Sequence, residues 1–161
     1  MTLDALNQLP STGAHDGFPR CRGSKRWASL MTDARPFLGY DALLAIAERT
    51  WWPLDAADWL EAFATHPRIG ERVTSTSSSK QRSVAAASPS ANVSARLAEG
   101  NRAYEQRFGY TFLVYATGLS AAELLAVLER RLAAHAADEL QVAAAQQRKI
   151  TALRLEKWLH S

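Results

Sequence analysis

Histidine is the residue type in this sequence best suited to proton transfer near neutral pH, and His66 has the surroundings that most favour such chemistry. It stands directly before Pro67, at the end of a predicted helix, where a loop can direct the imidazole into a cleft. An imidazole so placed suits proton transfer to or from carbon or oxygen. The alternative interpretation is that His66 caps the preceding helix through its last carbonyls. His15, His135 and His160 are expected to be solvated.

Two arginines, Arg68 and Arg107, are the other candidates. A guanidinium can hold a carboxylate or a ureido carbonyl through two parallel hydrogen bonds. Ordinary surface charge is the alternative, and it explains most arginines. Asn101 and Tyr104, on the same predicted helix as Arg107, are interpreted as structural. Cys21 has no neighbouring histidine or helix signal that would activate a thiolate, so it is interpreted as a packed residue.

Several classes of site are missing from the sequence. It contains no nucleotide-binding glycine loop, no H-E-x-x-H zinc motif and no G-x-S-x-G nucleophile elbow, and its histidines lack metal-ligand spacing. We therefore expect chemistry without a metal or an organic cofactor. The single cysteine excludes an intrachain disulfide and indicates a reducing cytoplasm. No apolar run approaches the ~20 residues of a membrane span, and no signal-peptide pattern is seen.

The charge is moderately basic. Nineteen lysines and arginines face 16 acidic residues, which gives a net charge of +3. The densest basic cluster is Arg20–Arg26. A basic helical nucleic-acid-binding module is therefore one alternative function, and it predicts salt-dependent binding to DNA. Scattered arginines fit anionic small molecules equally well.

Composition and periodicity predict an all-α fold in a single compact domain over residues 1–161, and the length also allows a tight two-lobed one. The chain has 30 Ala and 20 Leu against only 8 Gly and 6 Pro, which favours helices. Apolar residues at helical spacing predict seven or eight helices, the clearest over residues 27–34, 41–49, 55–65, 90–107, 120–136 and 138–159.

The expected helix ends rest on a few residues. Asp41 is expected as an N-cap, Ser120 as the N-cap of a capping box with Glu123, and Gly109 as a C-terminal glycine. Residues 10–19 are punctuated by proline and glycine and are expected as a connection.

Two segments do not follow the helical pattern. Tyr110–Ala116 carries strand-like residues, and either an isolated strand or an extended buried loop would fit it. Thr74–Ser90 has nine Ser or Thr among its seventeen residues, which indicates a loop or flap. We interpret this second segment as a candidate lid over a site.

Six phrases of the sequence together carry a resemblance that covers nearly the whole chain. They are Cys21–Trp27 (CRGSKRW), Ala34–Phe37 (ARPF), Asp58–Glu71 (DWLEAFATHPRIGE), Gly100–Gly109 (GNRAYEQRFG), Phe112–Gly118 (FLVYATG) and Arg148–Lys157 (RKITALRLEK). In this order and spacing they resemble the decarboxylase family that acts on 2-oxo-4-hydroxy-4-carboxy-5-ureidoimidazoline (OHCU), the third step from urate to allantoin in purine degradation. The His-Pro-Arg-Ile-Gly and Asn-x-x-Tyr-x-x-Arg-Phe-Gly blocks are its most specific parts.

The resemblance implies an all-α homodimer without metal or organic cofactor, and a small ureidoimidazoline as substrate. It places the catalytic histidine at His66, followed by Pro67, with (S)-allantoin as product. Within this mechanism we assign Gln81 to the ureido or ring amide of the substrate, and Arg107 to an anionic or carbonyl group. The remaining substrate-binding positions implied are Ser77, Ser78, Ser79, Lys80, Phe112, Leu113, Val114, Tyr115 and Ala116.

One position departs from the family pattern. The family has a glutamate before the glutamine, but this sequence has Lys80 before Gln81. A cation beside His66 would lower the pKa of the imidazole and compete for the same space. The nearest carboxylate downstream of His66 is Glu71. A catalytically impaired family member that binds the intermediate or a partner enzyme is therefore a second alternative.

Overall fold

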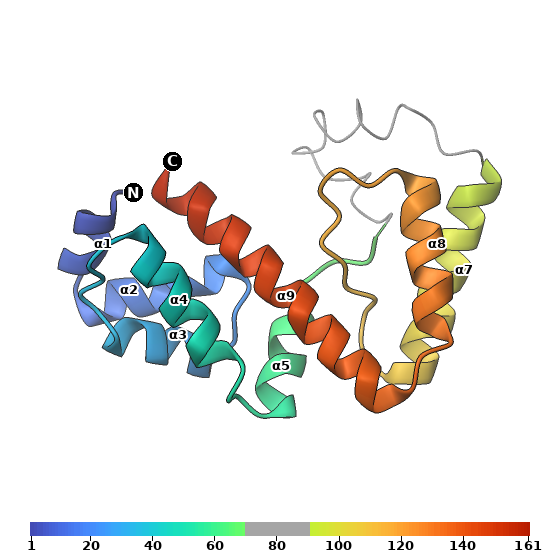
Figure 1. The fold of residues 1–161 in the computed structure, drawn as a ribbon, viewed down its shortest axis with the longest axis horizontal. Helices are drawn as coiled ribbons and strands as arrows, with labels where there is room; N and C mark the ends of the chain where they lie inside the picture. Colours follow the sequence, from blue (N-terminus) through green and yellow to red (C-terminus); the bar gives the residue numbers. More distant parts are fainter. Residues whose placement is uncertain (70–90) are drawn as a thin grey trace. The chain divides into compact units, whose positions relative to one another are not determined.

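The computed structural model of the chain describes residues 1–69 and 91–161 (Figure 1). Within these residues the regular structure is entirely helical, with eight α-helices, one 3-10 helix and no strand, so the expected all-α class is confirmed. The elements are α1 (Leu3–Gln8), α2 (Ser11–Gly17), the 3-10 helix η1 (Phe18–Cys21), α3 (Lys25–Asp33), α4 (Tyr40–Trp51), α5 (Ala56–Phe63), α7 (Ala91–Phe108), α8 (Ala121–Leu132) and α9 (Ala136–Leu159).

The chain divides into two compact units. The first comprises Met1–Thr65 together with Ala144–Ser161, and the second comprises His66–Ala143. The division therefore falls within α9, whose first residues belong to the second unit. The expectation of one domain over residues 1–161 stays a prediction.

Aromatic side chains fill the core of the first unit. Phe18 packs edge-on against Trp27, with ring centroids 5.7 Å apart. Trp27, Trp51 and Trp59 are buried, and each indole N–H donates to a backbone carbonyl at 3.0–3.2 Å. Burying an indole is favourable only when its N–H keeps a partner, so these bonds fix the three rings in place.

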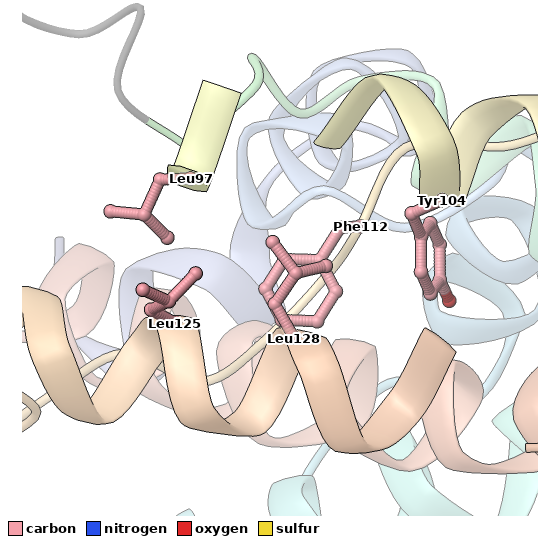
Figure 2. Packing of buried hydrophobic residues seen from close by; sticks show 5 residues of the cluster. All are labelled: Leu97, Tyr104, Phe112, Leu125 and Leu128. Carbon is pink, nitrogen blue, oxygen red and sulfur yellow. The ribbon is translucent and has the colours of Figure 1, made fainter. Parts of the chain in front are cut away.

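The core of the second unit lies between α7 and α8, which run side by side (Figure 1). Its buried cluster comprises Leu97, Tyr104, Phe112, Leu125 and Leu128 (Figure 2). The two helices approach closely at Gly100, where an added Cβ would lie 2.6 Å from a methyl carbon of Leu128. Glycine at this position therefore allows the cluster to close.

Several expected helix ends are confirmed. Ser120 Oγ accepts from the Glu123 N–H at 3.1 Å, and the Glu123 side chain accepts from the Ser120 N–H at 3.4 Å, which completes the capping box. Gly109 has a φ of +83° after α7, as a C-terminal glycine requires. The N-cap expectation for Asp41 is wrong, because α4 begins at Tyr40 behind Gly39. Asp41 instead places its carboxylate in the first turn, where the helix dipole favours a negative charge.

The connection expected over residues 10–19 is also wrong. Helix α2 and η1 occupy most of this stretch. Pro10 precedes α2 and Pro19 lies in the first turn of η1, and both are positions where the missing N–H removes no helical hydrogen bond. The two prolines therefore lie at helix N-termini, where they are compatible with the helices. Similarly, α9 begins at Ala136, before the expected start at Asp138.

Leu128→Ala tests the core of the second unit. Leu128 is fully buried against α7, so the substitution removes apolar contacts and leaves a cavity. We expect the free energy of unfolding, measured in urea, to fall by about 2–5 kcal/mol. The matched control is Leu60→Ala, because Leu60 is 39% exposed and should cost far less. Equal losses in both variants would contradict this packing.

Candidate active site

His66 follows directly on the end of α5. The helix begins at its N-cap Asp55, whose side chain accepts from the Asp58 N–H. At its other end, Ala62 O accepts from both the N–H and the hydroxyl of Thr65. The Arg22 guanidinium donates to Thr65 O, the carbonyl next to His66. These donors occupy the carbonyls of Ala62 and Thr65 at the end of the first unit.

The His66 imidazole is buried, with a relative exposure of 8% for the residue. Pro67 is exposed. The turn that follows is attached to α7 at two points. Arg68 forms a two-pronged ion pair with Glu105, at 2.6 and 2.8 Å. Asn101 Nδ2 donates to Ile69 O at 3.2 Å. Arg68 therefore does hold a carboxylate through two hydrogen bonds, but this carboxylate is Glu105 of its own unit.

The segment Tyr110–Ala116 is neither helix nor strand. Phe112 and Leu113 are buried at 1% and 3% exposure, so the interpretation as an extended buried loop is confirmed. Within the described part of the chain, the backbone N–H groups of Phe112, Leu113 and Val114 donate no backbone hydrogen bond.

A buried network of charged and polar groups lies beside this segment. Arg131 Nη1 donates to Leu113 O at 2.5 Å, and its Nε donates to Glu139 Oε1 at 2.7 Å. The Tyr104 hydroxyl donates to the same Glu139 oxygen at 2.5 Å. The Arg131 guanidinium also lies over the Phe112 ring, 4.7 Å from its centroid. The Arg131 and Glu139 side chains are 8% and 0% exposed.

Arg131 and Glu139 belong to none of the motifs that the sequence shows. The available signal was position, because Arg131 falls three residues after the buried Leu128 on the apolar face of α8. A charged side chain on a buried helix face requires a partner, and the first turn of α9 supplies one in Glu139.

Arg107 lies on the surface of α7. Its Nη2 donates to Ala134 O at 2.7 Å, and its guanidinium lies over the Phe108 ring. These contacts fix it against its own unit, and its role toward substrate stays a prediction. The proposed substrate-binding positions Ser77, Ser78, Ser79, Lys80 and Gln81 lie outside the described residues, as do Glu71 and the candidate lid Thr74–Ser90.

Three more singled-out residues, Cys21, His135 and His160, behave as expected, whereas His15 is only partly exposed. Cys21 is buried and unpaired, and burial raises the pKa of its thiol to about 12, so it is a packed residue. His135 and His160 are exposed. Over residues 1–69 and 91–161 no group of three or more His, Cys, Asp or Glu could hold a metal ion. No helix among these residues is long and apolar enough to cross a membrane.

The basic cluster near the N-terminus is partly engaged within the first unit. Arg22 donates to Thr65 O, and Arg26 lies 4.0 Å from Asp58. Both guanidinium groups therefore have protein partners in addition to solvent, which weakens the case for a nucleic-acid surface there.

Tyr104 makes the buried network sensitive to high pH. Burial, and then its hydrogen bond to Glu139, raise the pKa of Tyr104 above its usual value near 10. The unfolded chain ionises this phenol first, so stability that is present below about pH 10 is lost as the pH rises above it. In urea unfolding between pH 8 and 11, we expect the stability difference between the unaltered chain and Tyr104→Phe to shrink above pH 10. A difference that stays constant would contradict the burial of this hydroxyl.

Known proteins match the chain over most of its length. The family model described as OHCU decarboxylase matches residues 7–156. The uric acid degradation bifunctional protein TTL of Arabidopsis thaliana is 34% identical over 149 residues, which are 88% of this chain and 46% of that protein. The chain thus spans about half the length of this relative. A 2-oxo-4-hydroxy-4-carboxy-5-ureidoimidazoline decarboxylase of Haloferax volcanii is 27% identical over 96% of this chain and 94% of that protein.

Solved structures agree with the family match. A crystal structure of an OHCU decarboxylase in the presence of (S)-allantoin superimposes with a TM-score of 0.79 and 36% identity, covering 91% of this chain and 99% of that one. An (S)-allantoin synthase, 20% identical with a TM-score of 0.75 over 98% of this chain and 54% of that one, shares the fold. The family model and these relatives lead to one conclusion: the chain belongs to the OHCU decarboxylase family.

Proposed function

We propose that this chain decarboxylates OHCU and releases (S)-allantoin, a carboxy-lyase step of urate degradation. One observation carries the proposal: the turn after the buried His66 and the extended segment Phe112–Ala116 rest on the same core. Ile69, from the turn, and Val114, from the segment, both pack against the cluster around Phe112. A proton-transfer group and a row of backbone donors thus come from one unit of the chain.

The chemistry needs few groups. The bond between the ring carbon and the carboxylate breaks, carbon dioxide leaves, and the electron pair passes into the adjacent imine and carbonyl system. A proton then adds to a ring carbon, and its delivery to one face gives one enantiomer. His66 is the residue proposed for this proton transfer. The ring system itself accepts the electron pair, so no cofactor is needed as an electron sink.

The segment Phe112–Ala116 is proposed to hold the heterocycle through its backbone. The N–H groups of Phe112, Leu113 and Val114, which donate no backbone bond within the described part of the chain, suit the ring and carboxylate oxygens. Donors fixed before substrate arrives stabilise developing negative charge without reorganisation.

The other proposed contacts rest on the family pattern, apart from Arg107, which is proposed for an anionic or carbonyl group because a guanidinium can hold either. The contacts from the family pattern are Pro67, Ser77, Ser78, Ser79, Lys80, and Gln81 for the ureido or ring amide. A homodimer is proposed on the family pattern, and a cytoplasmic setting on the single cysteine. Lys80 also keeps one other candidate function open: an impaired family member that binds the intermediate or a partner enzyme without efficient turnover.

His66→Ala tests the proposed activity. Freshly generated OHCU is followed by circular dichroism, with the unaltered chain, with His66→Ala and with no protein. We expect the unaltered chain to give one allantoin enantiomer rapidly, and the variant to be at least about 100-fold slower, because the proton-transfer group is lost. His135→Ala is the matched control, since His135 is exposed in the same unit. Slow, racemic product in every tube would contradict the proposal.

Lys80→Glu separates the two candidate functions. The proposed decarboxylase predicts that the unaltered chain is already active with Lys80 in place. The impaired alternative predicts slow racemic product from the unaltered chain and a single enantiomer from Lys80→Glu, because the family carboxylate is then restored. Lys149→Glu makes the same charge change at an exposed position of α9 and controls for net charge. Rapid turnover by the unaltered chain excludes the alternative.

A further inference from the structure

We propose that Arg131, held in place by Glu139 and Tyr104, is a positioning residue that sets the backbone of Phe112–Ala116 for substrate recognition. The inference rests on the proposed function, because it takes this segment as the one that meets the heterocycle. It concerns three side chains that neither the sequence motifs nor the comparisons assign to the site.

The segment Phe112–Ala116 is held by tertiary contacts. No strand partner orders it, since the described residues contain no strand. Phe112 and Leu113 are nevertheless buried, and the Leu113 carbonyl accepts from Arg131 Nη1 at 2.5 Å. The same guanidinium covers the Phe112 ring at 4.7 Å. One side chain therefore fixes both the backbone and the neighbouring aromatic ring.

Arg131 is in turn held by Glu139, which also binds Tyr104. Glu139 Oε1 accepts from Arg131 Nε at 2.7 Å and from the Tyr104 hydroxyl at 2.5 Å. The guanidinium is planar and its donors point in fixed directions, so an anchor at Nε also sets the direction of Nη1. Tyr104 belongs to α7, Arg131 to α8 and Glu139 to α9. Side chains from three helices of the unit therefore fix the position of the Leu113 carbonyl.

Burying the Arg131–Glu139 ion pair has an electrostatic cost. Withdrawing two charges from water costs several kcal/mol per ion, and apolar residues of similar size often stabilise a fold as well or better. A pair that is 8% and 0% exposed is therefore weakly explained by stability alone. The fixed direction of its donors explains it better, because an apolar pair could not hold a carbonyl.

The geometry points to one particular amide. In a trans peptide the C=O and the N–H point in opposite directions. The peptide between Leu113 and Val114 turns its carbonyl toward Arg131, so the Val114 N–H points to the opposite side. Arg131 thereby sets the direction of a donor that makes no backbone hydrogen bond within the described part of the chain.

Two variants of the full-length chain test the inference. Arg131→Lys keeps the charge but cannot satisfy Glu139 and Leu113 O with the same fixed geometry. The double variant Arg131→Met/Glu139→Leu removes both charges together, which preserves folding better than removing one partner. Arg130→Lys is the matched control, because Arg130 is the exposed neighbour on α8.

The first readout needs no substrate. Backbone ¹⁵N order parameters report the rigidity of the Phe112–Ala116 amides, with values near 0.85 for a rigid backbone and below about 0.6 for a flexible one. We expect a fall from the rigid to the flexible range in both test variants, confined to this segment, and no change in Arg130→Lys. The second readout is kinetic: we expect KM for OHCU to rise at least about tenfold while kcat changes less, since binding contacts are lost.

Order parameters and KM that match Arg130→Lys in both test variants would overturn the inference. A rigid segment in the double variant alone would also overturn it, because that variant lacks the bond to Leu113. If the unaltered chain does not decarboxylate OHCU, the proposed function fails, and the order parameters still decide whether Arg131 fixes the segment.

Discussion

Arg131 and Glu139 bring opposite charges into the interior of the second unit, where their side chains are 8% and 0% exposed. Burying two charges is costly unless hydrogen bonds to fixed protein groups compensate. The Tyr104 hydroxyl donates to Glu139 Oε1 and the Leu113 carbonyl accepts from Arg131 Nη1, whereas Glu139 Oε2 is buried without a hydrogen-bond partner among the described residues. The segment Phe112–Ala116 has no helix or strand hydrogen bonds, and its position depends on this pair.

The same core also carries the histidine turn. Arg68 and Asn101 attach the residues after His66 to α7, and Ile69 packs on the cluster that holds Phe112. Helix α7 thus supports both halves of the candidate site within one unit. This arrangement suits a reaction that needs only a proton donor and oriented backbone amides from the protein, because the substrate ring itself accepts the electron pair.

Local rules predicted much of this from sequence. The capping box at Ser120 and the glycine at Gly109 were confirmed because neighbouring residues alone determine them. The connection expected over residues 10–19 was wrong because proline at a helix start has the opposite meaning to proline inside one. The Arg131–Glu139 pair could not be predicted for a different reason. Its role depends on the tertiary contact to Leu113, which residue spacing does not show.

The central claim is that His66 and Phe112–Ala116 form one site, and the most direct measurement is an NMR titration of the isotope-labelled chain with (S)-allantoin and, separately, (R)-allantoin. The account predicts saturable shifts of the His66 imidazole and of the Phe112–Ala116 amides with the S enantiomer, and weaker shifts with the R enantiomer. Shifts confined to the first unit, or identical responses to both enantiomers, would contradict it.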